Sequence, residues 1–270
     1  LGFNMLRKHA KIEPERFYYH CDQLGMLVWQ DMVNGGSAYK HWFVTYLATL
    51  MNWNHISFSD DEKHAGLLSR LHPEGKDEFR REITETIAFL YNHPSIVVWV
   101  PFNEGWGQFD ALAVCEQIRT LDSSRLVDHA SGWFDQKGGD ILSLHYYFLK
   151  LKFKPESKRA AALTEFGGYS LSIPGHSCCK KVYGYKKFNS TGALTYGYID
   201  LIRQTILPAV KKGIGATVYT QLSDIEEETN GIYTYDREIC KIDPDTLRKW
   251  NRALKEAGEC KTYADHTTDH

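Results

Sequence analysis

Short apolar runs alternate along the chain with longer stretches that have helical periodicity. Apolar runs bounded by polar residues are typical of buried strands, and apolar residues repeating every three to four positions are typical of amphipathic helices. The runs that predict strands are 3–8, 26–30, 95–102, 125–128, 140–145, 160–164 and 214–221. The stretches that predict helices are 15–24, 76–91, 110–121, 196–212 and 247–257. This alternation indicates β/α units around a parallel sheet.

Residues 32–75 interrupt the alternation. They contain the pair Gly35-Gly36, an aromatic stretch with helical periodicity over 39–53, and a polar stretch over 57–64. Connections of this length inside a compact domain are uncommon and are often functional. Two interpretations stay open: the segment builds part of a substrate site, or it packs over the rim of the sheet.

The predicted strands are one fewer than the eight of a TIM (β/α)8 barrel. The chain enters directly on a strand-like run at Leu1-Gly2-Phe3, without an initiator methionine. We therefore predict an α/β fold, a (β/α)8 barrel lacking its first β/α unit, as one domain over residues 1–257 of a longer chain. Residues 258–270 are polar and are predicted to be disordered.

Composition and charge narrow the possible partners. The formal net charge is −2 and the basic residues are spread along the chain, so neither nucleic acid nor a membrane surface is expected as a partner. Aromatic residues make up 13% of the chain, which fits stacking on sugar rings, although composition by itself favours a large core. The six cysteines are scattered apart from the pair Cys178-Cys179. This pattern is typical of reduced thiols and favours a cytoplasmic location.

Two glutamates follow predicted strands at the ends where a barrel carries its catalytic groups. Glu104 comes after the strand that ends in Phe102-Asn103, and Glu165 comes after 161–164. Hydrolysis of a glycosidic bond needs such a pair, since one carboxylic acid protonates the leaving oxygen while the other carboxylate attacks the anomeric carbon or activates water. Trp99 and Trp106 are expected to give the acid the apolar surroundings that keep it protonated. A single glutamate after a strand would more often be a cap or half of a salt bridge.

The residues around both glutamates resemble glycoside hydrolase family 2, the group of β-galactosidases, β-glucuronidases and β-mannosidases. The stretches 92–95 and 103–106 resemble the acid/base segment, and 164–167 resembles the nucleophile segment. The likeness also includes Arg7 with His9, the stretches 18–22 and 29–31, and 231–237, and it covers roughly residues 1–255.

The resemblance implies Glu104 as the acid/base and Glu165 as the nucleophile of a retaining enzyme. It implies that Asn103 binds the sugar 2-hydroxyl, that Tyr146 donates to Glu165, and that Arg7 sits beside that nucleophile. For Arg7, Tyr146 and His145 the alternative is a satisfied polar residue at the barrel rim. The remaining residues expected to line the sugar pocket are His9, Asp31, His145, Trp106 and Tyr219.

Three departures from the family pattern bear on substrate and metal. Gly35 and Ser37 stand where the β-galactosidase branch has a Glu-x-His metal pair, so no metal and no cofactor are predicted. Glu228 and Asn230 stand where the glucuronidase branch has Asn-x-Lys, and an acidic residue there opposes a uronate. Tyr219 replaces the usual tryptophan platform.

The sequence therefore predicts a retaining exo-β-glycosidase acting on a terminal neutral sugar, with a β-galactoside as the first expectation. A mannoside or glucoside substrate, a different barrel family with the same two glutamates, and a non-catalytic carbohydrate-binding fragment stay open. The expected partners are a carbohydrate substrate and β-sandwich domains preceding this barrel in the same chain. A homo-oligomer is a further open possibility.

Overall fold

The computed structural model describes residues 1–53, 56, 58–147 and 151–265. The chain divides into two compact units. We call residues 4–145 with 156–162 the N-terminal unit, and residues 1–3, 146–155 and 163–270 the C-terminal unit. Helices and parallel strands make up both, so the fold is of the α/β class.

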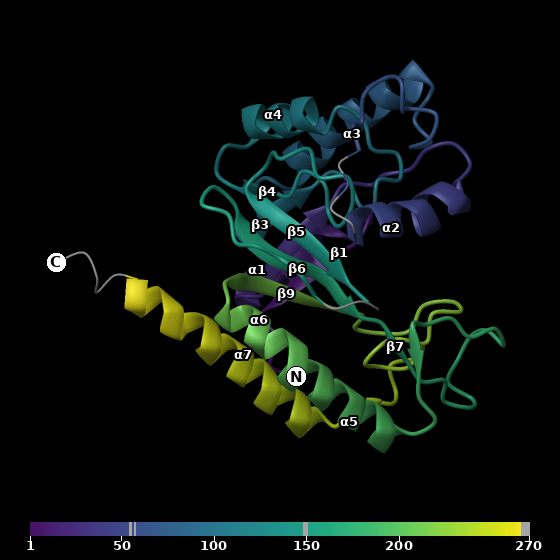
Figure 1. The fold of residues 1–270 in the computed structure, drawn as a ribbon, viewed down its shortest axis with the longest axis vertical. Coiled ribbons are helices and arrows are strands. Elements are labelled where there is room, and N and C mark those ends of the chain that lie inside the picture. Colours follow the sequence, from purple (N-terminus) through teal and green to yellow (C-terminus); the bar gives the residue numbers. More distant parts are fainter. Residues whose placement is uncertain (54–55, 57, 148–150, 266–270) are drawn as a thin grey trace. The chain divides into compact units, whose positions relative to one another are not determined.

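The N-terminal unit is built on a four-stranded parallel sheet (Figure 1). Its strands, in order, are β1 (Met5–Lys8), β2 (Leu27–Asp31), β3 (Ile96–Val100) and β4 (Leu126–Val127). The register pairs Arg7 with Trp29 and Gln30 with Trp99. Strand order follows chain order, as expected of successive β/α units.

Three helices cover one face of this sheet: α1 (Glu15–Leu24), α3 (Pro73–Leu90) and α4 (Ala111–Leu121). Their apolar residues form one core with those of the strands, including Tyr18, Val28, Ile83, Trp99 and Ile118. On β2 the buried Gln30 side chain accepts a hydrogen bond of 2.7 Å from the Tyr18 hydroxyl of α1. Because successive strand residues point to opposite faces, Asp31 faces away from these helices.

The long segment after β2 packs against loops of the same unit. It forms η1 (Trp42–Leu47) and α2 (Ala48–Trp53), within the aromatic stretch predicted to be helical. Phe43, Val44 and Leu68 are buried and pack with Trp133 and Phe134 of the loop after β4. These contacts support the rim-packing interpretation for the described part of 32–75.

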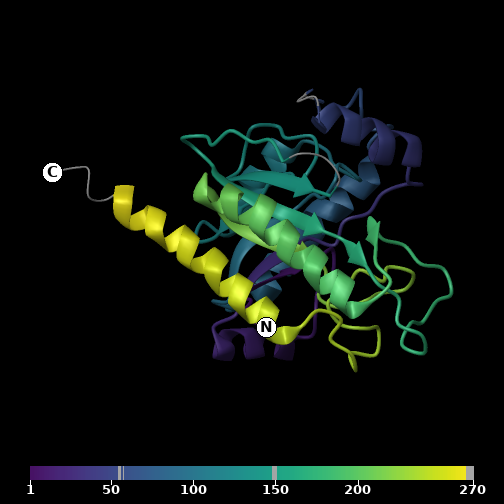
Figure 2. The same cartoon turned by 60° about the horizontal axis from the view of Figure 1, so that its bottom comes forward.

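In the C-terminal unit a long helix and the last helix lie side by side (Figures 1 and 2). The first consists of α5 (Thr191–Leu201), η2 (Ile202–Ile206) and α6 (Leu207–Lys211), and the second is α7 (Pro244–Asp265). Strand β9 (Ile214–Thr220) and most of β6 (Ala160–Gly167) also lie in this unit, whereas β5 (Ile141–Tyr146) lies in the N-terminal unit except for Tyr146. The short strands β7 (Tyr169–Ser170) and β8 (Lys186–Lys187) pair separately.

Two predicted helix ends differ most from the structure. Helix α7 continues to Asp265 instead of ending at Ala257, because 258–265 contain helix-forming residues such as Glu259, which pairs with Lys255 one turn earlier. Residues 266–270 of the predicted tail lie outside the described residues. Helix α5 starts at Thr191 instead of Tyr196, since the Ser190 side chain accepts from the Ala193 amide and caps it. Within the described ranges, no helix has both the length and the apolarity to cross a membrane.

Candidate active site

The N-terminal unit gathers four of the predicted site residues in one cluster, which is centred on the buried carboxylate of Asp31. Arg7, near the end of β1, donates from Nε to Asp31 Oδ1 and from Nη2 to Asp31 Oδ2, both at 2.9 Å. Arg7 Nη2 also lies 2.9 Å from Asn103 Oδ1, and His9 Nδ1 lies 2.8 Å from Asp31 Oδ2. The two-pronged ion pair fixes the guanidinium plane, so Asn103 is held by a rigid partner.

Asp31 remains ionised in this cluster although its side chain is buried. Burial by itself would raise the pKa of Asp31, but the charge of Arg7 and the hydrogen bond with His9 outweigh it, and the net pKa is lowered. The resemblance placed Arg7 beside the nucleophile. The structure shows its contacts with Asp31 and Asn103, and its relation to Glu165 stays a prediction.

Glu104 occupies a constrained position in the loop after β3. Its φ of 51° is in the left-handed region, which costs a residue with a side chain on the order of 1–3 kcal/mol. Its amide donates to the Ser131 carbonyl at 2.9 Å, and the neighbouring Asn103 forms a parallel bridge with Ser131. The loops after β3 and β4 are thereby tied together at the carboxyl ends of their strands.

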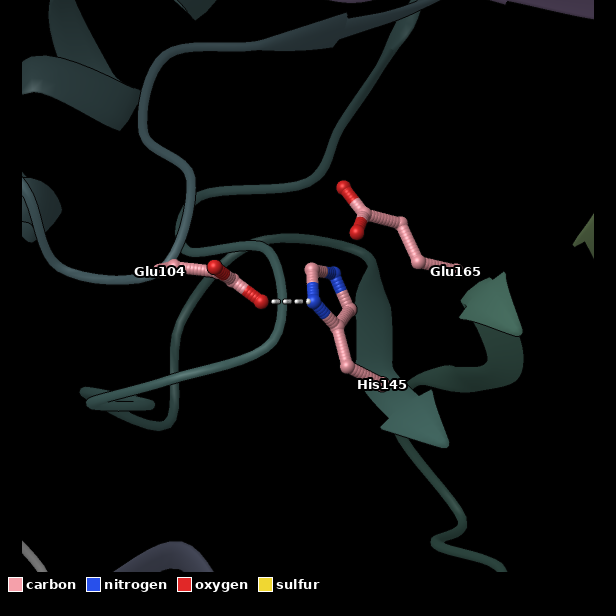
Figure 3. Close-up of side chains that lie close together, drawn as sticks. All are labelled: Glu104, His145 and Glu165. Carbon is pink, nitrogen blue, oxygen red and sulfur yellow. Dashed lines mark hydrogen bonds and ion pairs between the residues drawn. The ribbon is translucent and has the colours of Figure 1, made fainter. Parts of the chain in front are cut away.

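The Glu104 side chain points at His145, which is the second-to-last residue of β5 (Figure 3). Glu104 Oε1 lies 2.8 Å from His145 Nδ1, and the imidazole is fully buried. The Trp133 ring packs 5.5 Å from the imidazole. Gly132, with φ of 83°, leaves room for it, because a Cβ there would lie 2.6 Å from His145 Nδ1. The imidazole is therefore held in place to share a proton with Glu104.

Of the two tryptophans expected near the acid, only Trp106 is in its loop. Trp106 is partly exposed and packs edge-on against Tyr39, with ring centroids 5.5 Å apart. Trp99 is fully buried in the helix-side core, where its indole nitrogen donates to Asp122 at 2.9 Å. The expectation for Trp99 was wrong because its strand register turns it toward α4.

Glu165 lies near the end of β6 in the C-terminal unit. The Tyr147 hydroxyl donates to Glu165 Oε2 at 2.5 Å and lies 3.1 Å from Thr220 Oγ1 of β9. The Tyr147 ring stacks on Tyr185 at 4.0 Å. Gly168, with φ of 63°, permits this stack, since a Cβ there would lie 2.3 Å from the Tyr185 ring. A phenol donor of this kind favours the ionised carboxylate that a nucleophile needs.

Two aromatic assignments on this side need correction. The resemblance gave the hydrogen bond to Glu165 to Tyr146, whereas the structure gives it to Tyr147. Tyr219 was expected to stack on the sugar, but its buried ring packs against Phe166 and against Tyr198 of α5. Strand alternation turns Thr220, the next residue of β9, toward Tyr147.

The loop after β9 presents a connected polar group that includes Glu228. Gln221 Nε2 donates to Glu228 Oε2 at 2.9 Å and to Asn230 Oδ1 at 2.6 Å. Behind it, the fully buried ammonium of Lys241 pairs with Asp224 at 2.7 Å. This loop is thus held by buried polar contacts.

His176, Asp236 and Glu238 form a group that could hold a metal ion, with donor atoms within 4.8 Å of one another. His176 Nδ1 already lies 2.7 Å from Asp236 Oδ2, and all three side chains are at least partly exposed. The contact is explained as an ion pair joining two loops. The structure contains nothing further that points to a metal there.

The chain matches the family model "Glycosyl hydrolases family 2, TIM barrel domain" over residues 1–206. It belongs to glycosyl hydrolase family 2. The match contains both glutamate segments and the Arg7–Asp31 cluster, so the recognised resemblance and the TIM barrel class are confirmed.

Curated relatives in the family differ in the activity they are named for. A β-galactosidase of Leuconostoc mesenteroides is 25% identical over 277 residues, covering 97% of this chain and 24% of its own. A β-mannosidase B of Thermothelomyces thermophilus is 32% identical over 94 residues, covering 35% of this chain and 8% of its own. The chain therefore spans about a quarter or less of these relatives.

Solved structures of the family share the fold. A β-D-glucuronidase from Dictyoglomus thermophilum superposes with a TM-score of 0.62 and 15% identity, over 92% of this chain and 44% of its own. A family 2 β-galacturonidase from Eisenbergiella tayi bound to galacturonate gives a TM-score of 0.61 and 17% identity. This match covers 93% of this chain and 45% of the galacturonidase chain. At these identities the likeness carries the fold and not the substrate.

Proposed function

We propose that this chain is the catalytic part of a retaining exo-β-glycosidase, with Glu104 as acid/base and Glu165 as nucleophile. The observation that carries the proposal is the difference between the hydrogen-bond partners of the two carboxylates. Glu104 faces an imidazole that can accept or return a proton, and Glu165 receives a phenol hydroxyl. Two carboxyl groups with opposite proton requirements are what double displacement uses.

The proposed reaction has two steps. In the first, Glu165 attacks the anomeric carbon while Glu104 delivers its proton to the departing oxygen, and a covalent glycosyl ester forms on Glu165. In the second, Glu104 takes a proton from water, which attacks the same carbon and releases the sugar with its configuration retained. Asn103, held by Arg7 at 2.9 Å, is proposed to bind the 2-hydroxyl, where contacts strengthen at the transition state.

The proposed substrate is a terminal neutral β-linked sugar, with a β-galactoside first. The similarity to the Leuconostoc β-galactosidase over 97% of the chain supports this choice. A β-mannoside is the second candidate, since the higher identity of 32% over 94 residues is to a β-mannosidase. A uronide is disfavoured because Glu228, in the loop after β9, would repel its carboxylate.

The test uses the full-length enzyme and aryl β-glycosides that differ only in leaving group. Glu104→Gln should lower kcat/KM for a phenyl glycoside by about 10²- to 10⁴-fold and spare the 2,4-dinitrophenyl glycoside, whose leaving group needs no proton. Glu165→Gln should abolish turnover of both. A 2-fluoro sugar should label Glu165, and NMR should show the β-anomer as first product. Full activity in either variant, or an α-anomer, would refute the proposal.

A further inference from the structure

A chain of partly buried hydrogen bonds extends from Asp128 to Glu104 within the N-terminal unit. Asp128, which follows β4, accepts a bond of 3.0 Å from the Ser143 hydroxyl of β5. Ser143 Oγ lies 3.2 Å from Ser131 Oγ, which in turn lies 3.2 Å from His145 Nε2. The opposite nitrogen of that imidazole, Nδ1, lies 2.8 Å from Glu104 Oε1. A fully buried carboxyl group is thereby connected to the proposed acid.

We propose that Asp128, acting through Ser143 and Ser131, is a positioning residue that sets the proton arrangement of His145 and thereby holds the catalytic proton on Glu104. This inference rests on the proposed function, because it takes Glu104 as the acid.

The direction of the chain follows from its acceptor end. An ionised Asp128 only accepts hydrogen bonds, so Ser143 directs its hydroxyl hydrogen toward Asp128. Ser131 then donates to Ser143 and accepts from His145, which places the imidazole proton on Nε2. Nδ1 of this tautomer is an acceptor, and it can face only a Glu104 that carries its proton. The arrangement matches the state required before the leaving group departs.

Asp128 sits where its ionisation can change near neutral pH. Its side chain is fully buried, and Oδ1 has no hydrogen-bond partner in the part of the chain that the structure describes. Burial raises the pKa of Asp128 to about 6, opposed by the charge of Arg7, the hydrogen bond from Ser143 and the charge of His129, while Asp31 adds to the rise. A neutral Asp128 can donate to Ser143 and reverse the chain, which turns His145 Nδ1 into a donor suited to an ionised Glu104.

The sharpest test is Ser143→Ala in the full-length enzyme. This substitution interrupts the series of hydrogen bonds between Asp128 and His145 with only a small change in side-chain volume. For the phenyl β-glycoside, kcat/KM should fall about tenfold, the value of one hydrogen bond. The basic limb of its pH profile should move to lower pH by about one unit. The 2,4-dinitrophenyl glycoside should keep its kcat/KM, since its departure needs no acid. Ser143→Thr, which retains a hydroxyl, should restore the phenyl glycoside activity.

Two matched variants separate this role from a structural one. Ser95→Ala removes a buried serine elsewhere in the same unit, at the opposite end of β3, and should leave kcat/KM for both substrates unchanged. Asp128→Asn removes the ionisation and should reproduce the Ser143→Ala profile. It carries the test alone if Ser143→Ala does not fold.

Equal losses for both leaving groups with an unmoved pH profile, or no loss at all, would overturn the inference. The separate Glu104→Gln result tells the two proposals apart. If Glu104→Gln shows the leaving-group effect and neither Ser143→Ala nor Asp128→Asn does, only the inference about Asp128 fails. If Glu104→Gln shows none, the proposed function fails with it.

Discussion

Glu165 receives its 2.5 Å hydrogen bond from Tyr147, so the hydroxyl of that residue should matter for turnover. Tyr147→Phe keeps the ring that stacks on Tyr185 and removes only the donor. Hydrogen bonds to charged groups contribute roughly 1.5–3 kcal/mol, so we expect kcat/KM to fall about 10- to 100-fold. Steady-state kinetics with the 2,4-dinitrophenyl glycoside measure this loss without involving the acid.

Tyr146→Phe is the matched control, because it removes the same atom one residue earlier. We expect its kcat/KM to stay close to that of the wild type. The reverse pattern, with the loss at Tyr146, would show that the hydrogen bond assigned to Tyr147 is not the functional one.

Asp122, at the end of α4, illustrates a carboxylate whose role is stability. Its buried side chain accepts from Trp99 at 2.9 Å and from Arg125 at 2.6 Å. Burial would raise the pKa of Asp122, but the hydrogen bonds from Ser124, Arg125 and Trp99 prevail and lower it to about 2. The folded protein thus binds fewer protons than the unfolded chain between about pH 2 and 4.

The contribution of Asp122 is therefore present above about pH 4 and is lost as pH falls to 2, and it amounts to about 2 kcal/mol. Asp122→Asn should lower the free energy of unfolding by about that amount at pH 7 and should flatten its fall below pH 4. Urea denaturation at several pH values measures both. Asp245→Asn, at an exposed ion pair, should change neither, and an unchanged slope in Asp122→Asn would contradict this account.

Site residues were predictable where position along a strand was enough. The position of Glu104 after a strand could be inferred from the sequence, whereas Arg7 and Asp31 were expected from the resemblance to family 2, and the structure brings these two into contact. Tyr147 and Tyr219 could not be placed, because a shift of one residue along a strand reverses the face that a side chain occupies. Ser131 and Asp128 carry no local signal, since their contacts come from segments distant in sequence.

At the scale of elements, the loop after β9 depends on one buried ion pair. Lys241 donates to Asp224 at 2.7 Å and to the carbonyl groups of Leu171 and Thr229. Both charged side chains are buried, and burial raises the pKa of Asp224 and lowers that of Lys241. Removing one partner of such a pair leaves an uncompensated charge in the interior.

Lys241→Met should therefore destabilise the protein by roughly 3–5 kcal/mol, measured by chemical denaturation. Adding Asp224→Asn should recover part of the lost stability, because the buried carboxylate that Lys241 no longer neutralises is then removed. Lys255→Met is the control at an exposed pair on α7, with an expected change within about 0.5 kcal/mol. If Lys241→Met lowered the free energy of unfolding no more than Lys255→Met does, the buried pair would not be what holds the loop.

The order and type of the main elements were predictable because the periodicity of each was clear. Strands 26–30 and 140–145 appear as β2 and β5 with ends shifted by one residue, and the helix over 15–24 appears as α1 unchanged. Helix ends were less predictable, since α5 depends on the Ser190 cap and α7 on residues beyond its apolar face. The packing of 32–75 could not be derived, because its aromatic partners Trp133 and Phe134 lie in a loop after β4.

At the scale of the whole molecule, we predict that the charge of the loop after β9 decides which family 2 substrates fit. The solved structures named above are of a glucuronidase and a galacturonidase, yet this chain carries Glu228 in the loop after β9. A carboxylate there would repel a uronate by about 1–2 kcal/mol at a separation on the order of 10 Å. The wild-type enzyme should accordingly hydrolyse nitrophenyl β-galactoside or β-mannoside in preference to the β-glucuronide.

Glu228→Gln tests this reasoning, because it removes the charge and keeps an oxygen that can accept from Gln221. The ratio of kcat/KM for the uronide to that for the neutral glycoside should rise about tenfold, the factor that about 1.4 kcal/mol produces. Glu227→Gln, whose carboxylate already pairs with Lys181 at 3.6 Å, should leave the ratio unchanged. If both variants leave the ratio unchanged, the charge of this loop does not select the substrate, and the choice between neutral and acidic sugars must come from other residues.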